Sequence, residues 1–157
     1  MKKLAKLLAI AAAISTLAFT CTSCSDDSDD GDKCLLDLRK SISGTKVATF
    51  AGSGYDEEDD ANYENTVYFY KDSEGNTLVQ IDYKTQKGSE YGVYTAESGT
   101  YTGDPAADGD ITIHITKIYY PDDSLSTLEE EDVSYPAYTV TIDNGKFEYD
   151  DITYTRK

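Results

Sequence analysis

Apolar and polar residues alternate along most of the chain beyond residue 44. Every second position is apolar in three segments in particular, residues 79–83, 111–115 and 138–142. A period of two is typical of β-strands that bury one face and expose the other. Because β-branched residues and tyrosines fill these segments, the pattern predicts an all-β domain.

The candidate strands are separated by short runs of turn-forming residues. Asp143-Asn144-Gly145 and Glu74-Gly75-Asn76 are two such runs, and Asn and Gly readily adopt the positive φ angles of tight hairpins. Hairpins between successive strands predict an antiparallel up-and-down meander. About eight strands are predicted, over residues 45–50, 66–71, 77–84, 90–95, 98–103, 110–120, 135–142 and 146–155. Eight strands are enough to close the meander into a barrel without exposed edges.

Two stretches near the ends of the domain depart from this pattern. Leu35, Leu38 and Ile42 share a helical spacing and are followed by Gly44, which predicts a short N-terminal helix over 34–42. In the last strand the apolar positions change from odd to even around Asp150-Asp151. One extra residue there would switch the face of the strand, so a β-bulge is predicted.

Two predicted connections are longer than a hairpin requires. Residues 51–65 contain two glycines and the acidic run 56–60, and residues 121–134 contain a second acidic run. Long loops on a compact domain are often functional or disordered. Ser126-Thr127-Leu128-Glu129 has the form of a capping box, which predicts one helical turn in the second loop.

The N-terminal residues have the features of an export signal. Lysines at positions 2, 3 and 6 precede an apolar run over 7–19, which is too short to span a bilayer comfortably. Ser23-Cys24 resembles the lipobox of bacterial lipoproteins, with Thr20-Cys21 as the alternative. The resemblance implies a signal peptide over 1–23, acylation of Cys24 and a membrane anchor. The other interpretation is a cleaved signal without acylation, as in a soluble periplasmic protein.

The residues after Cys24 form an acidic segment. Residues 25–32 contain five aspartates and no apolar side chain, so they cannot pack and are predicted to be a solvated tether over 24–33. The remaining residues, 34–157, form the β-barrel domain. The tether also resembles the surface-export signal of some Gram-negative lipoproteins, which implies an outward-facing domain at the outer membrane. A simple spacer is the alternative.

The choice of acylated cysteine decides the chemistry of Cys34. If Cys24 is acylated, Cys34 is a single thiol. If Cys21 is acylated instead, Cys24 and Cys34 remain together and can close a disulfide in an oxidising compartment.

Composition narrows the possible functions. The chain has 14 Lys and Arg against 30 Asp and Glu, a formal net charge of −16, and a single His. Nucleic acids bind clusters of basic residues, so we do not expect nucleic acid as a partner. Because His114 has no partner that the sequence identifies, it supports neither a catalytic triad nor a His-rich zinc site. We expect neither enzymatic activity nor a cofactor.

Acidic residues do not form a recognisable metal motif. Residues 104–111 are similar to a calcium loop, but they lack a carboxylate two residues after the first and the bidentate glutamate of an EF-hand. The run 56–60 is predicted to be a solvated loop. No metal site is predicted.

Three segments resemble the strands of bacterial lipocalin-like lipoproteins: residues 66–72, residues 99–103 with 110–113, and residues 138–145. The resemblance covers most of residues 43–157, and Gly44-Thr45-Lys46 stands at the place of the family's Gly-x-Trp. It implies a cup-shaped barrel that holds a small apolar molecule, with the first long loop, residues 51–65, covering its mouth as a lid.

Tyrosines are the candidate ligand-binding residues, because their amphipathic rings can line a cavity. The candidates are Tyr68, Tyr70, Tyr83, Tyr101 and Tyr138, and Tyr94 and Tyr154 also lie in predicted strands. A barrel of eight strands either is filled by its own side chains or holds one small ligand. Two functions therefore stay open: a lipid-anchored carrier of a small apolar ligand, or a surface interaction module with a filled barrel.

Overall fold

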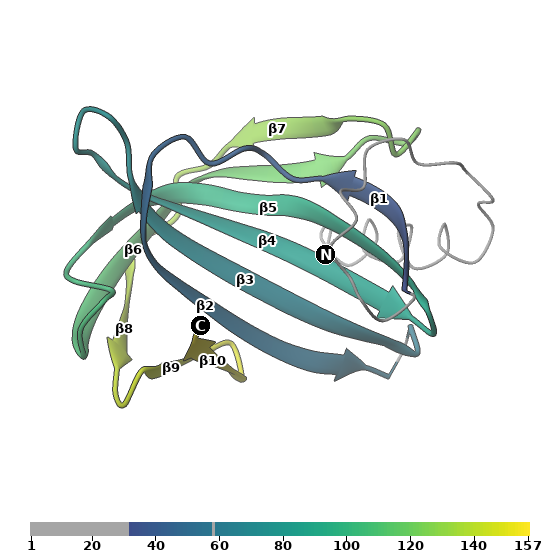
Figure 1. Cartoon of the computed structure of the whole chain (residues 1–157). Helices are drawn as coiled ribbons and strands as arrows, with labels where there is room; N and C mark the ends of the chain where they lie inside the picture. The colour runs from purple at the N-terminus through teal and green to yellow at the C-terminus, as the bar shows by residue number, and fades with distance from the viewer. Residues whose placement is uncertain (1–31, 58) are drawn as a thin grey trace.

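The computed structural model describes residues 32–57 and 59–157, and all of their regular structure is β (Figure 1). The predicted signal peptide, the acylation candidates Cys24 and Cys21 and most of the tether lie outside these residues. The strands are β1 (Lys33–Leu38), β2 (Thr45–Asp56), β3 (Ala61–Lys71), β4 (Thr77–Lys87), β5 (Glu90–Thr102), β6 (Gly109–Pro121), β7 (Leu128–Asp132), β8 (Tyr138–Ile142), β9 (Lys146–Tyr149) and β10 (Ile152–Arg156). Within the described residues no helix has the length and apolar character needed to cross a membrane.

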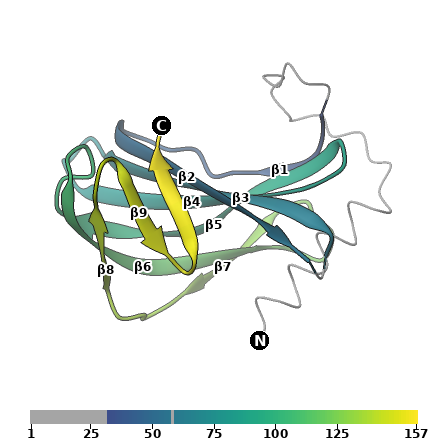
Figure 2. The ribbon, with the colours of Figure 1, turned by 90° about the horizontal axis from the view of Figure 1, so that it is seen from below.

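The ten strands belong to one sheet with the order β7-β6-β5-β4-β3-β2-β10-β9. Neighbouring strands are antiparallel, as the hairpin signals predict, except that β1 pairs with β5 in parallel. β8 pairs with the first part of β6 and β7 with its last part. Figures 1 and 2 show the long strands β2 to β6 twisting side by side, with the sheet curved so that the C-terminal hairpins face its middle.

The predicted barrel is wrong, because the sheet does not close. Its two ends approach each other at the β8–β9 hairpin, where Asp143 and Lys146 form an isolated bridge. Beyond that bridge the described residues form no ladder between these strands, which are only five and four residues long. The fold is an open, curved sheet with a concave and a convex face.

The predicted helix over 34–42 is also wrong, because residues 33–38 are extended in β1. β6 pairs only with residues 97–102 of β5, which leaves the edge at residues 90–94 for β1. Pairing there satisfies backbone groups on both strands and buries Leu35 and Leu36. This tertiary contact outweighs the local helical spacing.

The predicted lid is wrong, since residues 51–56 and 61–65 extend the β2–β3 hairpin. Gly52 and Gly54 mark close approaches between strands instead of a loop. A Cβ atom on Gly52 would lie 2.5 Å from Ile152 Cγ2, and one on Gly54 would lie 2.3 Å from the Tyr63 hydroxyl.

The predicted helical turn near Ser126 is absent from the structure. The Asp122 carboxylate accepts the backbone N–H groups of Ser126 and Thr127 at 2.8 and 3.1 Å, which holds residues 122–127 in a non-helical turn. The acidic run after it belongs to β7, where Asp132 lies 3.2 Å from Lys117 Nζ.

The turn at Asp143-Asn144-Gly145 is confirmed, with φ angles of 50° at Asn144 and 72° at Gly145. The predicted bulge at Asp150-Asp151 is wrong. These two residues have φ angles of 52° and 61° and form a tight turn between β9 and β10. A hairpin therefore causes the change from odd to even apolar positions.

The core lies on the concave face at the end of the sheet near the β3–β4 turn. It is built from residues that alternate along the strands, which are Phe50, Phe69, Val79, Tyr101, Ile111, Ile113, Val140 and Ile142. All of them are buried. The alternation predicts this face correctly.

Candidate ligand pocket

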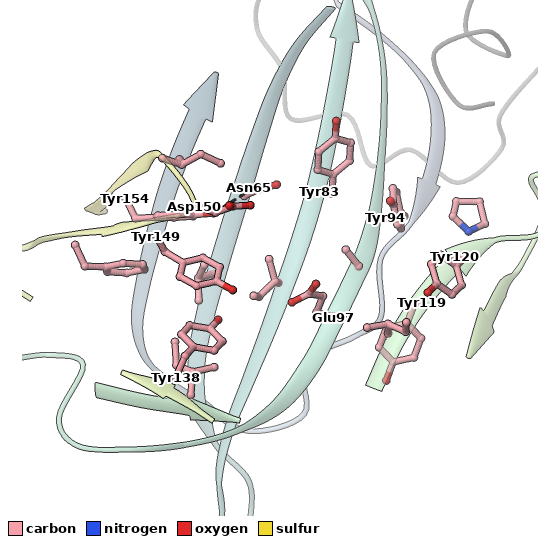
Figure 3. Close-up of a pocket in the computed structure, with 18 residues that line it drawn as sticks. Asn65, Tyr83, Tyr94, Glu97, Tyr119, Tyr120, Tyr138, Tyr149, Asp150 and Tyr154 are labelled. Carbon is pink, nitrogen blue, oxygen red and sulfur yellow. Dashed lines mark hydrogen bonds between the residues drawn. The ribbon is translucent and has the colours of Figure 1, made fainter. Parts of the chain in front are cut away.

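A cavity of about 260 Å³ lies on the concave face, between the middle strands and the C-terminal hairpins (Figure 3). Residues from β3, β4, β5, β6, β8, β9 and β10 line it. Its floor is apolar and is shared with the core, through Val67, Ile113, Ile118 and Phe147. Its walls carry seven tyrosines, which are Tyr83, Tyr94, Tyr119, Tyr120, Tyr138, Tyr149 and Tyr154.

The wall on β4 and β5 is formed by Tyr83 and Tyr94. Their ring centroids lie 5.8 Å apart at an interplanar angle of 59°. Burial, together with the negative charges of Asp56 and Asp59, raises the pKa of Tyr83 to about 12. Burial also raises the pKa of Tyr94. Both phenols are therefore neutral near pH 7 and can donate hydrogen bonds.

The opposite wall consists of two stacked aromatic pairs from the C-terminal hairpins. The rings of Tyr138 and Tyr149 lie 4.4 Å apart, and those of Phe147 and Tyr154 lie 4.8 Å apart. The β9–β10 register places Tyr154 opposite Phe147. Asn65 Nδ2 donates a hydrogen bond of 3.1 Å to the Tyr154 hydroxyl, which ties this wall to β3.

The third side of the pocket is the last part of β6. Tyr119 and Tyr120 both contact the cavity although they are adjacent in sequence. The Tyr119 hydroxyl lies 2.9 Å from Ser98 Oγ, so a hydrogen bond joins β6 to β5 at this point. The two ring systems close the side of the pocket nearest β7.

Glu97 is a carboxylate among these rings, and an irregularity in β5 directs it inward. In the β4–β5 ladder Ile81 pairs with Glu97 and Asp82 with Thr95, so Ala96 is an extra residue. A bulge switches the face of the strand that follows it. As a result Ala96 and Glu97 both line the pocket, whereas strict alternation from Tyr94 would place Glu97 outside.

Comparison of the chain with protein-family models, curated proteins and solved structures finds no match. The chemistry of the pocket is therefore the basis for inferring a function.

The structure brings two of the five candidate tyrosines into the pocket, Tyr83 and Tyr138. Tyr68 and Tyr70 lie on the convex face, because they alternate along β3 with Val67 and Phe69, which face the core. Tyr101 is only 2% exposed and packs edge-on against Phe69, with ring centroids 5.0 Å apart. These three tyrosines do not line the cavity.

The sequence pattern predicts some of the remaining pocket residues but not others. Tyr94 and Tyr154 lie in predicted strands and do line the cavity. Tyr119, Tyr120 and Tyr149 were missed, as was Glu97. Consecutive tyrosines near the end of a long strand are a weak signal, and the bulge that turns Glu97 inward has no signature in the sequence.

Some acidic residues outside the pocket have structural contacts in the described part of the chain. Asp108 accepts the backbone N–H groups of Asn144 and Gly145 at 2.9 and 3.1 Å, so the loop over 104–111 supports the β8–β9 turn. In the described part of the chain no group of three or more His, Cys, Asp or Glu could hold a metal ion. His114 is exposed on the face opposite Ile113.

Proposed function

We propose that this protein is a lipid-anchored, exported binding protein that holds a small, mainly apolar ligand in the concave pocket. The observation that carries this proposal is a cavity of about 260 Å³, walled by seven tyrosines, beside a densely packed core. Ligand sites are typically concave and apolar with a few polar groups that fix orientation. The tyrosine hydroxyls and Glu97 are such groups here.

The physical gain on binding comes mainly from burial. Each methylene group that a ligand transfers from water to the cavity contributes about 0.8 kcal/mol. The walls are rigidified by stacked rings and by the Asn65–Tyr154 and Ser98–Tyr119 contacts. A preformed site of this kind reduces the entropy lost on binding.

The edge of the open sheet does not favour the alternative function, a surface interaction module with a filled interior. β7 is an edge strand whose four acidic residues, 129–132, are exposed. Charged side chains on an edge strand oppose pairing with another chain. The cavity therefore provides a better-supported binding site than the edge.

The N-terminal anchor is part of the proposal, with Cys24 as the acylated residue and Cys21 as the alternative. Cys34 is disulfide-bonded in the structure. This bond favours the alternative, because acylation at Cys24 removes Cys21 with the signal peptide and leaves Cys34 as a single thiol. A disulfide between Cys34 and Cys24 is compatible only with acylation at Cys21, because an acylated thiol cannot form a disulfide. The intact mass of the mature protein, measured with and without reductant, distinguishes the two sites.

The anchored domain is proposed to reside at the outer membrane or on the cell surface. Protease added to whole cells should digest a surface-exposed domain. Complete protection in intact cells, with digestion after outer-membrane disruption, places the domain on the periplasmic side.

The binding proposal is tested by the small molecules that co-purify with the full chain. The chain is expressed with its own N-terminal segment in a bacterial host, kept in lipid nanodiscs, extracted with organic solvent and analysed by mass spectrometry. Ala96→Phe places a ring inside the cavity. Thr66→Phe is the matched control, because Thr66 lies on β3 but faces the convex side.

We expect one compound, near one equivalent per chain, with the wild type and Thr66→Phe but not with Ala96→Phe. The melting temperature of each variant establishes that it is folded. Identical extracts from all three proteins, with no binding of added apolar probes to the wild type, contradict the proposal.

A further inference from the structure

Two tyrosines of the pocket have hydroxyl groups that the packing of the protein leaves unpaired. They are Tyr94 on β5 and Tyr138 on β8, and the described residues provide no hydrogen-bond partner for either hydroxyl. The Tyr119 hydroxyl differs, because it lies 2.9 Å from Ser98 Oγ. Buried tyrosine hydroxyls usually have a partner, so these two hydroxyls are polar groups that a ligand can use.

Both hydroxyls border open space. Tyr94 is only 7% exposed, and Tyr138 is partly buried. Among the described residues, the fully enclosed side-chain atoms without a hydrogen-bond partner are Tyr101 Oη and Arg156 Nε. The hydroxyls of Tyr94 and Tyr138 are therefore not fully enclosed, and the cavity is the space that both side chains line. Figure 3 shows the two tyrosines on opposite sides of this cavity.

Both phenols keep their protons near neutral pH. Burial is the main cause of the raised pKa of Tyr94 and of Tyr138, and a neutral phenol carries one O–H donor. Water can accept this hydrogen bond until a ligand displaces the water. A ligand without an acceptor then leaves the O–H group enclosed and unpaired, which weakens binding. The pocket therefore selects for a ligand that accepts hydrogen bonds.

The lining of the pocket also limits the charge of the ligand. None of the described residues that line it is Lys, Arg or His. An anionic acceptor, such as a carboxylate, would lose its hydration without meeting a basic side chain. A protonated amine brings donors instead of acceptors, so it would leave the phenol protons unpaired. An uncharged acceptor avoids both penalties.

We propose that the ligand is an uncharged apolar compound with carbonyl oxygens, and that the hydroxyls of Tyr94 and Tyr138 donate hydrogen bonds to those oxygens. This inference rests on the proposed binding function and specifies its ligand class. A carbonyl oxygen accepts hydrogen bonds and carries no proton, so it pairs with a phenol without adding a further donor. The apolar body of the ligand packs against the floor of Val67, Ile113 and Ile118.

Three probes of nearly the same shape test the inference. Acetophenone carries a carbonyl group. In α-methylstyrene a methylene group replaces the carbonyl oxygen, and in benzoate a negatively charged oxygen replaces the methyl group. Each probe is titrated calorimetrically into the full chain in lipid nanodiscs, with empty nanodiscs as the blank.

Two double variants test whether the pocket hydroxyls are the donors. Tyr94→Phe combined with Tyr138→Phe removes both hydroxyls and keeps both rings. Tyr68→Phe combined with Tyr70→Phe is the matched control, because it removes two hydroxyls on the convex face, outside the pocket.

We expect the wild type and the control variant to bind acetophenone at least about tenfold more tightly than either of the other probes. The pocket variant should lose the preference for acetophenone over α-methylstyrene, because its binding of acetophenone weakens. Since the three probes are compared on the wild type itself, the test does not depend on the folding of a variant.

Two kinds of result overturn the inference in distinguishable ways. If the wild type binds α-methylstyrene or benzoate at least as tightly as acetophenone, or if the pocket variant keeps the wild-type preference, the carbonyl assignment is wrong and the binding function stands. If no probe binds the wild type, both the carbonyl assignment and the proposed function fail.

Discussion

The concave face has a packed end and a hollow end, and both are lined by aromatic residues. At the packed end Phe50, Phe69 and Val79 are completely buried, and the Phe50 and Phe69 rings meet edge-to-face at 5.9 Å. At the hollow end Tyr83, Tyr94 and their neighbours surround about 260 Å³ of space. Inward-facing and outward-facing residues alternate in the same way at the two ends, but side chains fill the concave face only at the packed end.

The two ends differ in side-chain chemistry and in strand irregularities. Phenylalanine and aliphatic side chains have no polar atoms and can interdigitate on all sides. Buried tyrosine hydroxyls usually find a hydrogen-bond partner, as Tyr154 does with Asn65 and Tyr119 with Ser98. The extra residue in β5 at Ala96 also places a carboxylate in the hollow end. A tyrosine-lined wall with a bulge is thus suited to a site, and a phenylalanine-lined wall to a core.

Deleting a ring should distinguish the two ends most strongly. Phe69→Ala leaves a cavity at a fully buried position and should lower the free energy of unfolding by about 3–5 kcal/mol. Tyr149→Ala removes a ring that is 43% exposed, and should cost about 1 kcal/mol. Urea unfolding of both variants measures the difference, and equal losses would show that the two ends are packed alike.

Adding a ring should have opposite consequences at the two ends. Val79→Phe overpacks a completely buried position and should cost about 1–3 kcal/mol. Ala96→Phe projects into the cavity and should leave stability unchanged or raise it by about 1 kcal/mol. Thermal unfolding of the pair is the measurement. A loss for Ala96→Phe as large as that for Val79→Phe contradicts the presence of a cavity.

The hollow end should also be sensitive to alkaline pH. The pKa of Tyr83 is about 12 in the folded protein and about 10 in an unfolded chain. Between these values the folded state binds more protons, so stability contributed by the neutral phenol is present below about pH 10 and is lost as pH rises towards 12. Tyr83→Phe should flatten this decline in unfolding experiments carried out between about pH 9 and about pH 12. An unchanged slope would mean that Tyr83 is not buried.

The smallest effect is expected at Tyr101, in the packed end. Its hydroxyl is buried without a hydrogen-bond partner among the described residues. Tyr101→Phe removes an unsatisfied polar group and should be neutral or stabilising by up to about 1 kcal/mol. Thermal melting measures this, and a clear drop in melting temperature would indicate that the hydroxyl has a partner.

The sequence predicts the strands better than it predicts how they are arranged. Alternation at 79–83, 111–115 and 138–142 correctly identifies strands and their buried face, and Asn144-Gly145 correctly identifies a hairpin. The barrel prediction fails because closure depends on a β8–β9 ladder, and strand count does not determine whether that ladder forms. The lid prediction fails because Gly52 and Gly54 are required by close strand contacts, which involve residues distant in sequence.

The pocket is only partly predictable for a related reason. Tyr83 and Tyr138 lie on regular strands, and the structure places them at the cavity. Tyr68 and Tyr70 alternate with the core residues Val67 and Phe69, so the period-two pattern itself assigns them to the other face. Glu97 could not be placed from the sequence, because one extra residue in β5 reverses the expected orientation.

The most direct test of the central claim is whether an apolar probe stabilises the protein through the hollow end. The melting temperature of the full chain in lipid nanodiscs is measured at increasing concentrations of tert-butylbenzene, for the wild type and for Ala96→Phe. A ligand that binds the folded state raises the melting temperature as its concentration exceeds the dissociation constant. We expect a concentration-dependent rise for the wild type and none for Ala96→Phe. The same response from both proteins, or no response from the wild type, would contradict the assignment of the hollow end as a ligand site.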